Sequence, residues 1–155
     1  MLTVRLATSP VDLAAAFLIR HQVFVVEQGV PLELELDERD DDDATDHVIA
    51  VDDGEVVAAG RLVEEAAGFE GIDVEAGPVG HLGRLAVSDR HRGLGLGVAL
   101  VGAIEQRAQQ RGLPVIYLSS QTHAVAFYER LGYAVYGEEF DDAGIPHRHM
   151  RKLLL

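Results

Sequence analysis

Apolar residues alternate with polar ones, or form short continuous runs, in seven segments of the chain. This pattern predicts strands at residues 3–6, 47–51, 55–63, 81–87, 115–118, 133–136 and 149–153. The run Val115-Ile116-Tyr117-Leu118 is apolar throughout, as expected of a central strand that is covered on both faces. Asp52-Asp53-Gly54 separates two of the strands and predicts a hairpin turn.

Between these strands, apolar residues recur at helical spacing. Ser9 before Pro10 is typical of a helix start, and the helical stretch that follows continues to residue 27 and is broken by Gly29 and Pro31. A second helix is predicted from Gly95 to Arg111. Ser120 can cap a third, whose apolar positions run from residue 124 to 131, before Gly132.

The resulting order is β-α-β-β-β-α-β-α-β-β, which predicts an α/β fold: a mixed α+β sheet with helices packed on it. No repeat or linker divides the chain, so residues 1–155 are expected to form a single domain. Residues 64–79 are predicted to form a loop. The acidic run Glu33–Asp46 is also predicted to be a solvated loop, since it lacks the ligand spacing of a calcium loop.

The net charge of the chain restricts the kinds of partner that it can bind. Twenty-six acidic residues against 13 basic ones give a net charge of -13, and Lys152 is the single lysine. Such a field repels nucleic acids. It also suggests an acidic surface adapted to a high-salt, halophilic setting, where self-repulsion is screened. The absence of cysteine fits a reducing interior, and no signal peptide or membrane span is visible, which together predict a cytoplasmic protein without membrane contact.

The segment Arg90-His91-Arg92-Gly93-Leu94-Gly95, between a strand and a helix, is the strongest candidate for chemistry. Glycines let the backbone turn, and the first amides of a helix point outward without internal partners, so anions bind there. A Walker loop requires a lysine that is missing. A dinucleotide-binding turn requires glycine where the chain has Val98.

Two motifs carry a family resemblance. Gly83-Arg84-Leu85-Ala86-Val87 with the glycine turn, and the segment Gln121 to Tyr133, resemble the two signature motifs of the GNAT superfamily of acyl-CoA N-acyltransferases. Further residues resemble its ElaA-like branch. They are Arg20, Val23 to Gln28, Leu34 to Asp37, His47 and Glu139 to His147.

The resemblance implies that acetyl-CoA is the acyl donor and that an amine attacks its thioester directly. The backbone of Leu85, Ala86 and Val87 would pair with the pantetheine arm as an added strand does. The amides of residues 91–95 would hold the pyrophosphate, with Arg90 and Arg92 adding charge. The positions implied to contact the donor are Leu85, Ala86, Val87, Arg90, His91, Arg92, Gly93, Leu94, Gly95, Gln121 and Tyr128.

For catalysis, the resemblance implies that Tyr128 is the general acid. By its pattern alone Tyr128 also fits a core position beside Phe127 and Leu131. The base stays open between His81, Glu64 and Glu27. His147 and His149 alternate on one strand and are expected to face the same side, but no further ligands point to a metal site.

Two functions from different classes remain. One is an N-acetyltransferase acting on the amine of a small molecule or a peptide, and the other is an inactive acyl-CoA-binding sensor or interaction module. A different phosphate-binding enzyme is disfavoured by the failed nucleotide motifs. A homodimer is one assembly that the sequence leaves open.

Overall fold

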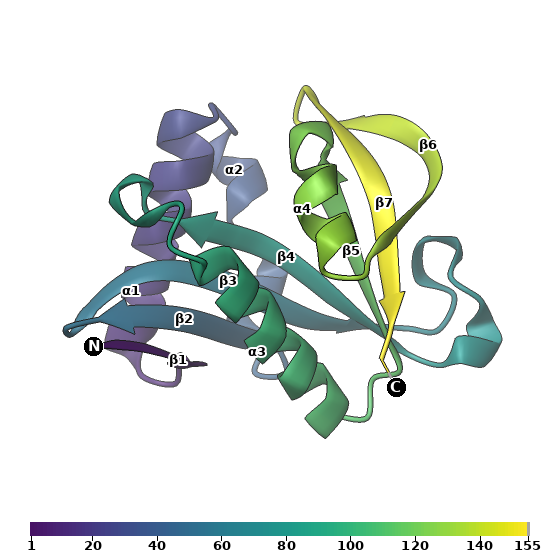
Figure 1. The fold of residues 1–155 in the computed structure, drawn as a ribbon, viewed down its shortest axis with the longest axis horizontal. Coiled ribbons are helices and arrows are strands. Elements are labelled where there is room, and N and C mark those ends of the chain that lie inside the picture. The colour runs from purple at the N-terminus through teal and green to yellow at the C-terminus, as the bar shows by residue number, and fades with distance from the viewer. Residues whose placement is uncertain (155) are drawn as a thin grey trace. The chain divides into compact units, whose positions relative to one another are not determined.

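The computed structural model describes residues 1–154, and Figure 1 shows the predicted order of elements with one additional short helix, α2. The strands are β1 (Leu2–Leu6), β2 (Asp46–Asp52), β3 (Glu55–Glu65), β4 (Val79–Val87), β5 (Val115–Gln121), β6 (Ala134–Asp142) and β7 (Ile145–Leu153). The helices are α1 (Pro10–Arg20), α2 (Leu32–Glu35), α3 (Leu96–Gln110) and α4 (Val125–Arg130). The seven strands form a mixed sheet in the order β1-β2-β3-β4-β5-β7-β6, which confirms the predicted fold class.

The chain divides into two compact units, and each is described by itself. The first contains Met1–Val63 and Leu82–Gln106, and the second contains Glu64–His81 and the chain from Arg107 onward. Strands β3 and β4 and helix α3 contribute residues to both. The single domain predicted for residues 1–155 stays a prediction.

In the first unit, β1, β2 and β3 pair antiparallel, with Ile49 of β2 opposite Ala59 of β3. Helices α1 and α3 lie on opposite faces of these strands (Figure 1). Ala16 of α1 packs in a core cluster with Ile49 and Ala59. On the other face, a Cβ added to Gly60 would lie 2.9 Å from Ile104 of α3, so this glycine permits the helix to pack closely.

The start of α1 follows the local sequence. The side chain of Ser9 accepts a hydrogen bond from the Asp12 amide at 3.1 Å, and proline occupies the first turn. At Arg20 the helix continues into a π-helical turn, η1 (His21–Glu27), a wider coil that the pattern did not predict. Gly29, with φ of 72°, then ends the helical stretch as predicted.

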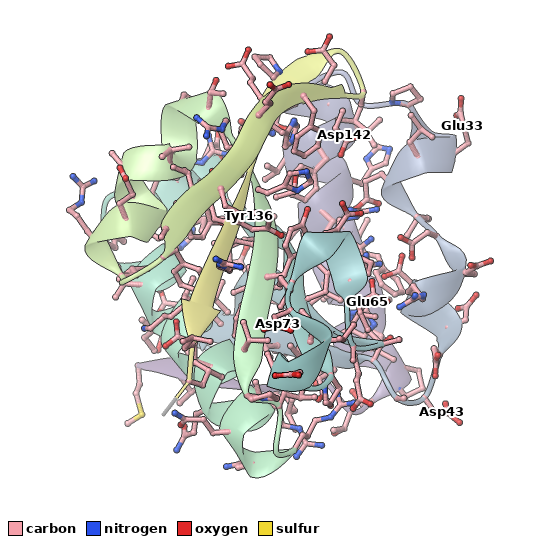
Figure 2. All side chains as sticks on the ribbon, turned by 90° about the vertical axis from the view of Figure 1, so that its right-hand side faces the viewer. Glu33, Asp43, Glu65, Asp73, Tyr136 and Asp142 are labelled. Carbon is pink, nitrogen blue, oxygen red and sulfur yellow. The ribbon has the colours of Figure 1, made fainter. Side chains whose placement is uncertain are left out.

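The acidic segment corrects one prediction. Instead of a solvated loop, residues 33–46 contain the end of α2 and a 3₁₀ turn, η2 (Glu38–Asp41), and the side chains of Glu35 and Asp40 are buried. They are buried because arginines from distant parts of the first unit pair with them. Glu33 and Asp43 do point outward, as Figure 2 shows.

In the second unit, β4 pairs parallel with β5 over Val79–His81, and β7 lies antiparallel between β5 and β6. The loop was predicted at residues 64–79, but Glu64 and Glu65 belong to β3 and Val79 to β4, and the loop of residues 66–78 carries two 3₁₀ turns, η3 (Phe69–Gly71) and η4 (Val74–Ala76). It covers a core of Ile72, Val79, Val115 and Tyr117.

Ser120 marks a second correction. It was predicted to cap a helix, but it lies within β5, where it is buried, and its hydroxyl donates to the Gln121 carbonyl at 2.8 Å. Helix α4 starts only at Val125, after a 3₁₀ turn, η6 (Thr122–Ala124). Because β5 pairs with β7 as far as Gln121 opposite His147, the ladder keeps this stretch extended. Strands β6 and β7 are likewise longer than predicted.

Candidate functional site

In the first unit, the glycine turn joins β4 to α3. Gly93 and Gly95 have φ values of 79° and 80°, in the left-handed region that favours glycine. The turn is anchored by the Ser88 amide, which donates to the Val57 carbonyl at 2.9 Å. The fifteen residues of α3 follow directly, so the first amides of this helix lie at the end of the turn. This is the arrangement predicted for an anion site.

The two arginines of the turn are placed differently. Arg90 is exposed. Arg92 donates through Nε to the Val87 carbonyl at 3.1 Å and through Nη2 to Glu27 at 2.9 Å. Hydrogen bonding to Glu27 raises the pKa of Arg92. Arg92 therefore connects the turn to the end of β4 and pairs with the carboxylate of Glu27, a candidate base.

His91 lies at the same turn. Its Nε2 is 3.8 Å from Asp52, and its Nδ1 is buried without a hydrogen-bond partner among residues 1–154. Leu94, by contrast, is exposed.

The strand before the turn carries the residues predicted to bind the pantetheine arm. Ala86 is buried, and Leu85 and Val87 are half-buried. Arg84, directly before them, has a φ of 54° although it lies inside a strand. The backbone therefore departs from a regular strand one residue before Leu85.

In the second unit, Tyr128 lies on α4 with its ring against Phe127 and Tyr133, at centroid distances of 5.0 and 5.9 Å. It is buried, and burial raises its pKa to about 12. The core position that its pattern allowed is thus occupied, and the hydroxyl keeps its proton at neutral pH.

Gln121 lies at the end of β5, and its Oε1 is 2.6 Å from Nε2 of His123. The amide is thus held by its neighbour in the turn that leads into α4.

His81, a candidate base, has a carboxylate partner that sequence reasoning missed. Its Nδ1 lies 3.1 Å from Oε2 of Glu65, which Figure 2 labels, and its ring contacts those of Phe69 and Tyr117. Glu65 is buried, whereas Glu64 is exposed. Alternation along β3 could have identified Glu65, because it lies two residues after the buried Val63, but the predicted strand ended at that valine.

Glu64, another candidate base, accepts a hydrogen bond from Nη2 of Arg111 at 3.3 Å. Its side chain is 48% exposed. Glu64 therefore lies at the surface, with an arginine as its partner.

Histidines of β7 form a ring cluster in this unit. His147 and His149 both stack on Phe140, which confirms that they share a face. Nδ1 of His149 lies 2.7 Å from the Tyr117 hydroxyl, and burial raises the pKa of Tyr117. Tyr136, labelled in Figure 2, stacks on His149 from β6. No group of three or more potential ligand side chains within residues 1–154 is arranged to hold a metal ion.

No helix within residues 1–154 combines the length and apolar character needed to cross a bilayer.

Comparison with known proteins places these features in a family. The family model described as an acetyltransferase (GNAT) domain matches residues 14–154. An N-acetyltransferase of Bacillus subtilis that is named uncharacterised, YjcF, is 38% identical over 148 residues, which cover 95% of this chain and 96% of that protein.

Solved structures agree with this match. An acyl-CoA N-acyltransferase from Pseudomonas aeruginosa superposes with a TM-score of 0.81 at 33% identity, covering 98% of both chains. ElaA of Escherichia coli gives a TM-score of 0.82 at 25% identity, covering 98% of this chain and 99% of that one. The similarity extends over nearly the whole of each chain.

Proposed function

The chain belongs to the GNAT acetyltransferase family, which includes the ElaA-like proteins, and we propose that it transfers an acetyl group from acetyl-CoA directly to an amine of a small molecule or peptide. The observation that carries the proposal is the glycine turn at the start of α3, where Gly93 and Gly95 are left-handed and Arg90 is exposed. On a chain of net charge -13, such a turn is a local site for an anion.

The donor would be held in two ways. Amides of residues 91–95 and the start of α3 bind the pyrophosphate, with Arg90 supplying charge. The backbone of Leu85–Val87 pairs with the amides of the pantetheine arm, in the manner of an added strand. Arg92 supports the turn through Val87, so it shapes the phosphate site even where it does not touch the phosphate.

In the reaction, the lone pair of the amine attacks the thioester carbonyl, and a C–N bond forms. The tetrahedral intermediate then collapses, the C–S bond breaks, and the thiolate of CoA leaves. Tyr128 donates its proton to that thiolate, the role that the family resemblance gives it, and the excess proton of the amine passes to a base. An amide of β4 facing the carbonyl oxygen would stabilise the developing charge.

Among the candidate bases, the geometry favours His81. Glu65 accepts a hydrogen bond from Nδ1–H of His81 in this assignment, which leaves the lone pair on Nε2 to take a proton. Glu65 would then be a positioning residue that fixes the tautomer and the orientation of the ring, as a carboxylate does in hydrolytic triads. Glu64 and Glu27 are engaged by Arg111 and Arg92 instead.

Two measurements test the function. Calorimetric titration with acetyl-CoA tests the donor site, and release of free CoA thiol across a panel of amines tests transfer. Saturable binding with amine-dependent thiol release supports the proposal. Binding without release from any amine favours an acyl-CoA sensor, and absence of binding at low and high salt rejects both. Longer acyl-CoA donors compared in the same assay identify the preferred acyl chain.

A further inference from the structure

Arg84 has a backbone conformation that its surroundings must enforce. Of the non-glycine residues with positive φ within residues 1–154, Asp53, Glu70 and Ala143 lie in turns, whereas Arg84 lies inside β4 with φ of 54°. A residue with a Cβ is disfavoured in this region and persists there only when neighbouring contacts over-determine it. The contacts of the Arg84 side chain are therefore informative.

The guanidinium of Arg84 binds the end of α2. Nε donates to the Glu35 carbonyl at 2.9 Å, and Nη2 donates to the Leu34 carbonyl at 3.2 Å and to the Asp37 carboxylate at 3.2 Å. Carbonyls at the end of a helix lack internal partners, so the arginine caps α2 while it pairs with a carboxylate. One side chain thus clamps residues 34–37 to β4.

The segment that Arg84 binds is also held by two further arginines. Arg20, which is 1% exposed, binds Glu35 at 2.6 Å and Asp40 at 2.6 and 2.9 Å. Arg61 binds Asp37 at 2.7 Å and Asp40 at 3.0 Å. Three arginines thus face three carboxylates, and their charges balance within the first unit. The end of α2 is a rigid support for Arg84.

We propose that Arg84 is a positioning residue for the acyl donor. Its hydrogen bonds to residues 34–37 hold its own backbone in the left-handed conformation, and this conformation directs the backbone of Leu85–Val87 toward the pantetheine arm. This inference rests on the proposed function. One left-handed residue in a strand redirects the next peptide group away from the regular ladder, as a bulge does. Fixing that direction before binding removes an ordering cost from donor binding.

The test separates the side chain from the backbone. Arg84→Gly removes the clamp but leaves a residue that adopts positive φ readily, and Arg84→Ala removes the clamp and disfavours that φ. We expect acetyl-CoA to bind Arg84→Gly about tenfold more weakly than the wild type, and Arg84→Ala about tenfold more weakly again. Amide exchange at residues 85–87 should rise in the same order.

Arg5→Ala is the matched control, because Arg5 also pairs with a carboxylate and a carbonyl but is exposed on β1. Its acetyl-CoA affinity should equal that of the wild type. Arg84→Lys, which keeps the charge but places its N–H donors on a single nitrogen, should bind better than Arg84→Ala and supplies a folded variant if the alanine variant fails to fold.

The outcomes distinguish the two proposals. Folded Arg84 variants that bind acetyl-CoA with wild-type affinity overturn the positioning role alone, as does equal weakening in the glycine and alanine variants. A wild-type protein that does not bind acetyl-CoA overturns the positioning role together with the proposed function. Graded weakening with Arg5→Ala unchanged supports it.

Discussion

At the scale of single residues, burial decides which side chains hold a proton at neutral pH. Burial raises the pKa of Tyr128 to about 12, so its hydroxyl is protonated at neutral pH, as the proposed acid role requires. His81 is placed differently, with one nitrogen on a buried carboxylate and a ring that is partly exposed. The two side chains are thus suited to opposite directions of proton transfer.

Replacing Tyr128 by phenylalanine removes the hydroxyl and keeps the ring contacts with Phe127 and Tyr133. We expect kcat to fall by about 10²–10⁴-fold, because the thiolate then leaves unprotonated. Acetyl-CoA affinity by calorimetry should change little. Full turnover with chemistry shown to be rate-limiting would contradict the acid role.

The pair of His81 and Glu65 gives a graded prediction. His81→Gln should lower kcat by about 10²–10⁴-fold with a donor dissociation constant near that of the wild type. Glu65→Gln should cause a smaller loss, because the imidazole keeps its place but loses the carboxylate that fixes its tautomer. Glu64→Gln is the adjacent control and should leave kcat unchanged. A Glu65→Gln variant with the kcat of the wild type would argue against the pairing.

At the scale of elements, features that depend on adjacent residues were predicted from the sequence, whereas features that depend on residues far along the chain were not. The start of α1 at Ser9, the hairpin turn at Gly54 and the glycine turn before α3 depend on a few adjacent residues, and all were predicted. Glu35 and Asp40 were assigned to a solvated loop because their burial depends on arginines far along the chain: Arg84 and Glu35 are 49 residues apart. Composition cannot reveal which acids have such partners.

The residues of the candidate site also divide into those predicted from adjacent residues and those missed because their role depends on distant ones. The turn at Gly93 and Gly95 was found from its own residues, whereas Glu65 was missed because its role appears only once β3 and β4 are placed beside each other in the second unit. Ser120 was misassigned because its capping propensity is local and the ladder that holds it in β5 is not.

The glycine turn yields a prediction with an internal control. Gly93→Ala and Gly95→Ala should each cost about 1–2 kcal/mol in the left-handed conformation and weaken acetyl-CoA binding as the turn shifts. Gly102→Ala lies within α3, has no atom within 4 Å of an added Cβ, and should raise stability by up to about 1 kcal/mol without affecting binding. Urea unfolding and calorimetry measure the two effects. Unchanged affinity in both turn variants would remove the turn from the donor site.

At the scale of the whole molecule, buried groups set the dependence of stability on pH. Burial opposes ionisation of Asp40, but hydrogen bonds from Arg20 and from the Asp37 amide outweigh it and hold the pKa of Asp40 well below its usual range. The pKa of Asp37 is also lowered, mainly because its hydrogen bond to Arg61 outweighs the effect of burial. Burial lowers the pKa of His47, which stays neutral inside the fold.

All three folded-state pKa values lie below the unfolded ones, so each group adds stability at higher pH and loses it on acidification. The free energy of unfolding should therefore decline in two steps. The first begins below about pH 6.5, as unfolded His47 takes up a proton, and the second begins below about pH 4, as unfolded aspartates do. Urea unfolding from pH 8 to pH 3 measures both. His47→Gln should abolish the upper step alone, and a flat profile in the wild type would contradict the assignment.

The net charge of -13 predicts a response to salt. Screening of self-repulsion should raise the free energy of unfolding from dilute buffer to molar KCl. The rise should shrink near pH 5, because this pH is close to the sequence pI of about 4.8 and the net charge is small there, and this serves as the control. Equal or greater stability in dilute buffer would exclude adaptation to high salt.

The cluster of Arg20, Arg61 and Arg84 with Glu35, Asp37 and Asp40 also has a consequence for how this sequence can change over time. Four of the six, Arg20, Glu35, Asp40 and Arg61, are buried, and a single replacement that removes one of their charges leaves a buried partner uncompensated, which typically costs about 3–5 kcal/mol. Changes at these four positions should therefore be concerted: an arginine is lost together with an acid, or neither is lost. Related sequences should show these positions changing in pairs, while acids on the outward side of the same segment, such as Glu33 and Asp43, vary singly.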